Sequence, residues 1–181
     1  MAEQTEDERC ADARRFLRIH NAFVAGDMAE VRAALGDPDD FPNTREGLAF
    51  GVPLVYAVYW SPLEFVRGLL DAGADPNFHD DDGFPPIIAA LCKLLPAPGS
   101  KPRDDVFELV ELLLERGSDP NQRGLNDYTP LHYLAGIGEV SLIPLLLAHG
   151  ADPTARTRID SYETPKEVAL YAGHAAAAAL L

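Results

Sequence analysis

The chain has 181 residues, of which 47% are apolar and 24% are charged, so we expect one globular domain with its own core rather than a disordered chain. Its formal net charge of −14 disfavours binding to nucleic acid or to an anionic membrane surface, because both need a basic protein surface. The first ten residues are acidic and polar, unlike a secretory signal, and no run of apolar residues is long enough to span a membrane. Since only two cysteines occur, we expect a cytoplasmic protein without a disulfide framework.

Three leucine-rich segments, each followed by the same kind of turn, recur along the chain. FVRGLLDA (65–72), LVELLLER (109–116) and LIPLLLAH (142–149) are followed by GADPN, GSDPN and GADPT. Their apolar residues recur with helical spacing, and the glycine after each segment favours a left-handed helix end. Asp-Pro-Asn is typical of a turn. Each segment is therefore predicted to be a helix that ends at its glycine.

A second motif precedes each of these helices. VPLVYAV, PPIIAAL and TPLHYLA begin at Val52, Pro85 and Thr129, and a fourth copy, TPKEVAL, begins at Thr164. Threonine can cap a helix and proline is tolerated in the first turn, so each segment predicts the start of another helix. The chain is thus predicted to repeat a unit of two short helices and a turn.

The spacing of the motifs reveals an insertion. The starts at Val52 and Pro85 are 33 residues apart, whereas those at Pro85 and Thr129 are 44 apart. The glycine spacing becomes regular again after Gly117, so the extra residues lie before it. Residues 94–104, LLPAPGSKPRD, are the predicted insert, and their prolines indicate a semi-rigid loop that is either a second contact site or tolerated length.

This pattern resembles the ankyrin repeat. The stretch DYTPLHYLAGIGEVSLIPLLLAHGADPT, residues 127–154, matches the family pattern most fully. Asp127 stands where the family usually has glycine, and Pro144 falls inside a predicted second helix, which it can kink or shorten. The resemblance implies an all-α ankyrin-repeat solenoid of helix-turn-helix units with short β-hairpin connections, about five units including atypical caps. It also implies that His132, at the family's histidine position, hydrogen-bonds the backbone of a nearby turn.

The repeat register gives the domain boundaries. We expect a single ankyrin-repeat domain over residues 13–181, preceded by a flexible acidic N-terminus. The expected parts are 1–12 (N-terminus), 13–43 (N-terminal cap), 44–77, 78–121 with the insert 94–104, 122–154, and 155–181 (C-terminal cap).

The segment NFHDDDGFPP, residues 77–86, is a candidate metal or catalytic site because His79 is followed by Asp80, Asp81 and Asp82. A calcium loop needs alternating ligands and a glutamate near its twelfth position, and this segment has neither. In the repeat register the acidic run is a hairpin tip, and runs of like charge usually mark solvated surface. No nucleophile motif or phosphate loop occurs in the sequence. We therefore expect no enzyme activity, no catalytic residue, no metal and no cofactor.

The resemblance implies a binding site of another kind, a concave face formed by hairpin tips and first helices. Transferred by register, its partner-binding residues are Leu48, Tyr59, Trp60, His79, Asp80, Asp81, Asp82, Phe84, Arg123, Leu125, Asn126, Tyr128, Ile137, Arg156 and Tyr171. The same register places Cys92, Ser161 and Glu163 on this face. Exposed aromatic residues are typical of interface hot spots. Tyr59 and Trp60 fit either this face or the core.

The predicted function is protein–protein recognition by a monomer whose partner protein carries a basic patch that complements the acidic residues. A narrower alternative is an inhibitor or immunity-type antidote of one basic enzyme or toxin. The alternative from another class is a metal-dependent or catalytic role at His79 to Asp82.

Overall fold

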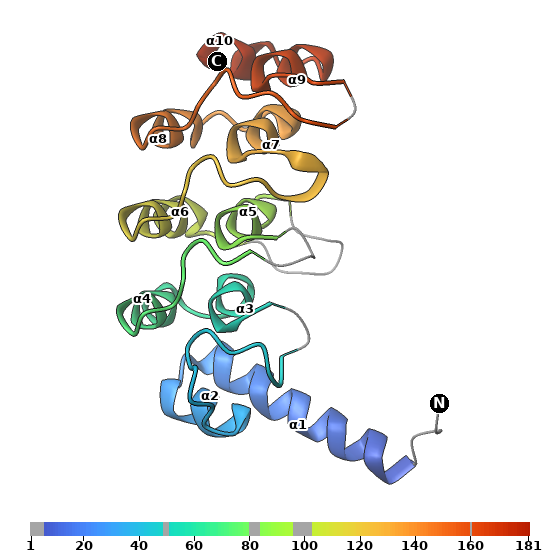
Figure 1. Ribbon diagram of the computed structural model, residues 1–181, viewed down its shortest axis with the longest axis vertical. Helices are drawn as coiled ribbons and strands as arrows, with labels where there is room; N and C mark the ends of the chain where they lie inside the picture. The colour runs from blue at the N-terminus through green and yellow to red at the C-terminus, as the bar shows by residue number, and fades with distance from the viewer. Residues whose placement is uncertain (1–5, 49–50, 80–83, 96–102, 160) are drawn as a thin grey trace. The chain divides into compact units, whose positions relative to one another are not determined.

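The computed structural model describes residues 6–48, 51–79, 84–95, 103–159 and 161–181 (Figure 1). These residues form helices and turns and contain no strand, so the fold is all-α, as the repeat pattern predicts. The helices are α1 (Glu6–Ala25), α2 (Met28–Leu35), α3 (Pro53–Trp60), α4 (Leu63–Asp71), α5 (Pro86–Cys92), α6 (Val106–Glu115), η1 (Leu125–Asp127), α7 (Pro130–Ile137), α8 (Ile143–Ala148), α9 (Pro165–Tyr171) and α10 (Ala175–Leu180). The chain divides into two compact units, Met1–Asp75 and Pro76–Leu181. A single domain over residues 13–181 stays a prediction.

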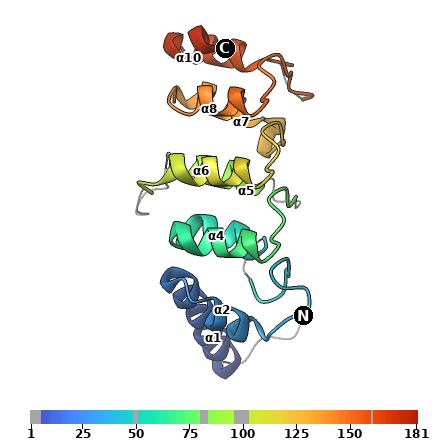
Figure 2. The same ribbon diagram turned by 90° about the vertical axis from the view of Figure 1, so that its left-hand side faces the viewer.

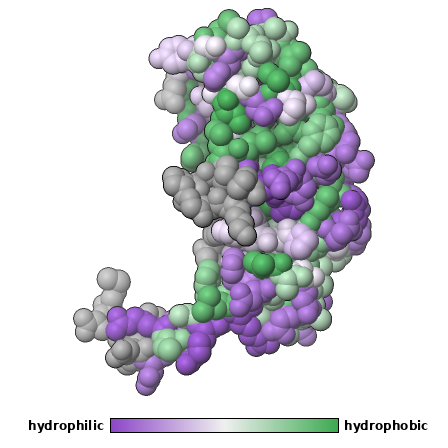
Figure 3. Space-filling model, turned by 180° about the vertical axis from the view of Figure 1, so that it is seen from behind, coloured by the Kyte–Doolittle hydropathy of each residue, from purple (hydrophilic) through white to green (hydrophobic). Residues whose placement is uncertain are grey.

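In the N-terminal unit, α1 packs against α2 and α3, and α3 packs against α4. The core contains the ring of Phe23, whose centroid lies 4.7 Å from that of Tyr56 and 5.7 Å from that of Phe65. Helix α1 already begins at Glu6, so residues 6–12, which we expected in a flexible segment, are helical. The physical reason is that Glu, Ala and Arg, which dominate EDERCADARR, are strong helix formers. Figure 3 shows this end of α1 as a mostly hydrophilic projection.

In the C-terminal unit, the first helices α5, α7 and α9 pack side by side, and each contacts its own second helix, α6, α8 or α10. Figure 2 shows the turns between successive repeats of this unit on one side of its helices. The turns stand where short hairpins were expected, and backbone hydrogen bonds close them. Gly124 N donates to Tyr128 O at 2.9 Å, and Thr157 N donates to Glu163 O at 3.0 Å.

The ends of the second helices confirm the glycine prediction. Gly73, Gly117 and Gly150 have φ values of 93°, 91° and 90°, a left-handed conformation that a Cβ atom would strain. The predicted insert, residues 94–104, falls between α5, which ends at Cys92, and α6, which begins at Val106. Most of it, residues 96–102, lies outside the described residues.

Pro144 shortens the second helix of its repeat. Helix α8 begins at Ile143, so Pro144 lies in its first turn, where the missing N–H has no intrahelical partner to lose. The helix has six residues, whereas α6 has ten. The proline thus sets the start of α8 instead of kinking it.

Asparagine side chains join successive repeats within each unit. The amide of Asn77 donates to Gly117 O at 2.8 Å, and its oxygen accepts from Asp119 N at 2.6 Å. Asn43 and Asn121 make the same pair of bonds, Asn43 to Gly73 and Asp75, and Asn121 to Gly150 and Asp152. Thr154, at the next equivalent position, instead donates to Asp152 of its own turn at 2.7 Å. Each asparagine therefore fixes the helix end of the following repeat.

Candidate functional site

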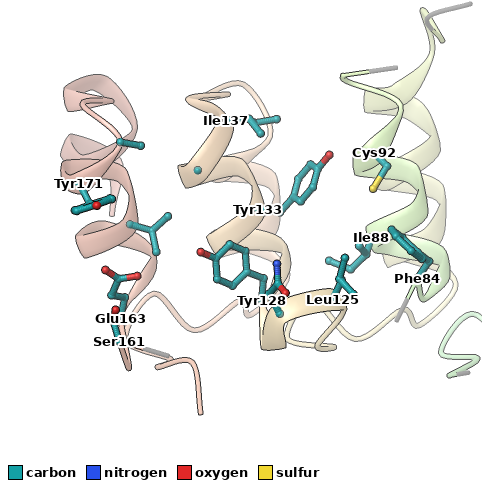
Figure 4. Close-up of a pocket in the computed structure, with 14 residues that line it drawn as sticks. Phe84, Ile88, Cys92, Leu125, Tyr128, Tyr133, Ile137, Ser161, Glu163 and Tyr171 are labelled. Atoms are coloured by element: carbon teal, nitrogen blue, oxygen red, sulfur yellow. The ribbon is translucent and has the colours of Figure 1, made fainter. Parts of the chain in front are cut away.

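A groove of about 590 Å³ runs along the first helices of the C-terminal unit (Figure 4). Its lining comes from α5, α7 and α9 and from the turns that precede them. These helices begin at prolines after an extended residue, and their buried sides pack against the second helices. The opposite side of each helix therefore faces the groove.

Six of the predicted partner-binding residues line this groove: Phe84, Leu125, Asn126, Tyr128, Ile137 and Tyr171. Phe84 precedes α5, Leu125, Asn126 and Tyr128 precede α7, Ile137 ends α7 and Tyr171 ends α9; Figure 4 labels all of them except Asn126. The side chains of Tyr171 and Leu125 are 89% and 55% exposed, so apolar surface lies open to solvent here. The register prediction thus placed these six residues on one continuous surface.

The groove also contains Ile88, Tyr133, Gly136, Val168 and Ala172, which the register did not select. Helical periodicity is the signal that could have found them. Ile88 lies four residues before Cys92, and Tyr133 lies four residues before Ile137, so each shares a helix face with a residue that the register selected.

His132 contacts two residues of the groove lining, Tyr128 and Glu163. It is buried, its Nδ1 lies 2.8 Å from Thr129 Oγ1, and its Nε2 lies 3.0 Å from Glu163 O. Its ring also stacks on that of Tyr128, with centroids 5.5 Å apart. Burial lowers the pKa of His132, which favours the neutral ring. The expected bond to a nearby turn is present, and it positions two groove residues, Tyr128 and Glu163.

The predicted arginines are engaged in ion pairs within the chain. Arg123 Nη1 lies 2.6 Å from Asp127 Oδ2, and Arg156 Nη1 lies 3.0 Å from Glu167 Oε2. Arg158 Nη2 also lies 2.6 Å from Asp127 Oδ1. These cations neutralise neighbouring carboxylates and hold the turns in front of α7 and α9.

Asp127, which stands where the family usually has glycine, has a left-handed backbone conformation. Its φ is 61°, the left-handed region that aspartate tolerates better than most residues. The hydrogen bond from Arg158, together with the charge of Arg123, lowers the pKa of its carboxyl group. The departure from the family pattern therefore provides an acceptor for two arginines.

Replacing Asp127 by asparagine is expected to lower the free energy of unfolding by about 1 kcal/mol at pH 7, because both ion pairs lose their anion. A folded-state pKa below the unfolded value stabilises above the unfolded pKa and is lost as the pH falls through the folded pKa. The difference between wild type and variant should therefore shrink below about pH 4. Urea unfolding at pH 7, 4 and 3 measures it, with Asp104→Asn as the exposed control. A difference that does not depend on pH would contradict the assignment.

The predicted partner-binding residues of the N-terminal unit differ in solvent exposure. Trp60 is 41% exposed and contacts the ring of His20 at a centroid distance of 5.2 Å, whereas Tyr59 and Leu48 are half-buried. Tyr56, which was not a candidate, is buried in the core, and its hydroxyl lies 3.0 Å from His20 Nδ1. Trp60 is therefore a surface residue, and its role in binding stays a prediction.

The predicted acidic residues Asp80, Asp81 and Asp82 lie outside the described residues. His79 is exposed. Within the described ranges, no three His, Cys, Asp or Glu side chains come together in a group that could hold a metal ion. In the same part of the chain, no helix has the length and apolar character needed to cross a membrane.

Comparison with known proteins identifies the fold family. Residues 101–181 match the family model of ankyrin repeats in three copies. The chain is an ankyrin repeat protein. Ankyrin repeats are in general protein–protein interaction modules, and proteins of this family are typically not enzymes.

Relatives of this ankyrin repeat protein occur in animals and plants. "Ankyrin repeat, SAM and basic leucine zipper domain-containing protein 1" is 33% identical over 132 residues in Dasypus novemcinctus, and 35% identical over 123 residues in Mus musculus. XBAT35 of Arabidopsis thaliana, whose name contains the words "E3 ubiquitin-protein ligase", is 32% identical over 125 residues. The matches cover 72%, 67% and 68% of this chain. They span 26%, 24% and 24% of these relatives, so the chain corresponds to about a quarter of each.

Proposed function

We propose that this ankyrin repeat protein binds a partner protein through the groove along α5, α7 and α9, and that it does so without catalysing a reaction. The observation that carries this proposal is the open apolar lining of the groove, where Leu125 and Tyr171 are exposed beside Phe84 and Tyr128. Apolar side chains gathered in a concave site favour an interface, because a partner that covers them removes this surface from water.

The chemistry of the lining also favours a protein partner. Tyrosine and phenylalanine supply large, rigid contact areas and are frequent at the centre of interfaces. Asn126 and Ser161 add hydrogen-bonding groups at the same surface. A protein surface offers both apolar side chains and backbone groups to such a mixed lining.

A double variant of the exposed groove residues tests the proposal. Leu125→Ala with Tyr171→Ala is expected to weaken partner binding at least about tenfold, because exposed aromatic and aliphatic anchors contribute most of the affinity. The free energy of unfolding should stay within about 0.5 kcal/mol of the wild type, since both side chains lie largely in water. The partner is captured from native lysate with the wild-type chain and purified, and binding is then measured by calorimetry.

The matched control is Phe107→Ala with Val140→Ala. Both are exposed apolar residues of the same unit, and neither lines the groove. This control should bind the partner like the wild type. Equal binding by the groove variant, or equal losses in both double variants, would contradict the proposal.

The acidity of the chain supports a partner with a basic surface. A net charge of −14 attracts such a protein over distances comparable to the Debye length and speeds its association. The narrower role of an inhibitor or antidote would require that the captured partner has an activity which this chain suppresses.

A further inference from the structure

The groove contains a carboxylate among apolar and aromatic side chains. Of the described residues that line it, Glu163 is the charged one, and it lies at the turn before α9 next to the exposed Tyr171 (Figure 4). The backbone of Glu163 is fully used, because its N–H donates to Thr157 Oγ1 and its carbonyl accepts from Thr157 N and His132 Nε2. The residue is thus held in place by its main chain.

The Glu163 side chain has no such role. Within the described part of the chain, its carboxylate has no hydrogen-bond or ion-pair partner. The neighbouring cations are committed elsewhere, Arg123 and Arg158 to Asp127, and Arg156 to Glu167. None of these ion pairs includes the Glu163 carboxylate, so this group stays open to direct pairing with a cation from a partner.

The groove residues near Glu163 suit the aliphatic stem and the charged end of a lysine or arginine side chain. Lysine and arginine carry an aliphatic stem that packs on apolar surface, and their charged end is attracted to the faces of aromatic rings. Tyr128 and Tyr171 both line the groove and supply such rings, and the stacking of Tyr128 on His132 fixes one of them. Val168 and Ala172 add aliphatic surface to the same lining.

We propose that the groove recognises a lysine or arginine side chain of the partner, with the cation paired to Glu163 and the stem packed between Tyr128 and Tyr171. This inference rests on the proposed function, since it names the chemistry of the partner residue at the same site. It assigns to Glu163 the selection among partners and to the apolar lining most of the affinity.

A selection of random 12-residue peptides displayed on phage, with the whole chain as target, tests the inference. Peptides that bind the wild type are expected to be enriched in Lys or Arg flanked by apolar residues. For such a peptide, Glu163→Gln is expected to reduce affinity about tenfold, and replacing the peptide's cation by glutamine should reduce it by a similar factor on the wild type. On Glu163→Gln the second replacement should have little further effect, because the two groups act on each other.

A control variant and the groove double variant distinguish a wrong cation site from a groove that does not bind partners. Glu115→Gln removes the same charge from an exposed position on α6 outside the groove and should bind the peptides like the wild type. If Glu163→Gln binds as tightly as the wild type while Leu125→Ala with Tyr171→Ala does not, the cation site is wrong and the groove still binds partners. If neither variant changes binding, both proposals fall. A selection that yields no cationic enrichment also overturns the inference.

Discussion

Replacing His132 by alanine is expected to lower the free energy of unfolding by about 2 to 4 kcal/mol. The side chain is fully buried and uses both ring nitrogens, one toward Thr129 at the start of α7 and one toward the carbonyl of Glu163 before α9. The variant would leave a void and would deprive both partners of their hydrogen bonds. Urea unfolding followed by circular dichroism at pH 7.5 measures the change. His149→Ala, at an exposed histidine of the same unit, is the control, and a loss no larger than that of the control would contradict the role assigned to His132.

The same residue predicts a pH dependence. The pKa of His132 is lowered by burial, so the unfolded chain takes up a proton at a pH where the folded chain does not. Stability is therefore fully present above the unfolded value of about 6.5 and falls as the pH drops below it. Between pH 7 and pH 5 the wild type should lose stability more steeply than His132→Gln, whose side chain does not titrate. Parallel slopes for the two proteins would show that His132 is not buried in its neutral form.

Replacing Asn121 by alanine should lower the free energy of unfolding by about 1 to 3 kcal/mol, because two hydrogen bonds to the next repeat are lost together. The variant removes the donor to Gly150 O and the acceptor for Asp152 N. Those two backbone groups close the end of α8, so they would have to be satisfied by water. Hydrogen exchange of the Asp152 amide should become faster in the variant, which locates the effect.

Thr154 provides the matched control for this substitution. It occupies the equivalent position of the next turn, but its side chain bonds Asp152 within that turn. Thr154→Ala should therefore cost less than Asn121→Ala. Equal losses would mean that the asparagines stabilise their own turns rather than the neighbouring repeats.

The fold follows from the sequence because its signals are local and repeated. The TPLH segment predicts the start of α7, and the capping box of Thr129 with His132 supplies the physical reason. In α9 the same box is formed by Thr164 with Glu167, so a glutamate replaces the histidine without loss of the helix start. The early start of α1 was missed because the acidity of its first residues suggested disorder, although helix propensity favours these same residues.

Part of the groove lining was predicted from the sequence, and the reasons why the rest was not are physical. Positions of the repeat register gave Leu125, Tyr128 and Tyr171, because residues at equivalent positions of stacked repeats share one face. The repeat register does not show which charged side chains form ion pairs within the chain and which are available to a partner. Arg123 and Arg156 were expected to face a partner, whereas their pairing with Asp127 and Glu167 depends on contacts between turns that no single motif encodes.

The two ends of Glu163 serve separate purposes, and this separation bears on how the protein can change. Its carbonyl receives the hydrogen bond of His132 whatever side chain the residue carries, while its carboxylate points into the groove. If Glu163 selects the partner residue as proposed, residue 163 can vary in charge and size while its backbone bonds persist, and mutation there is expected to change which partner side chain is preferred. A library randomised at this position would sample binding specificities at nearly constant stability.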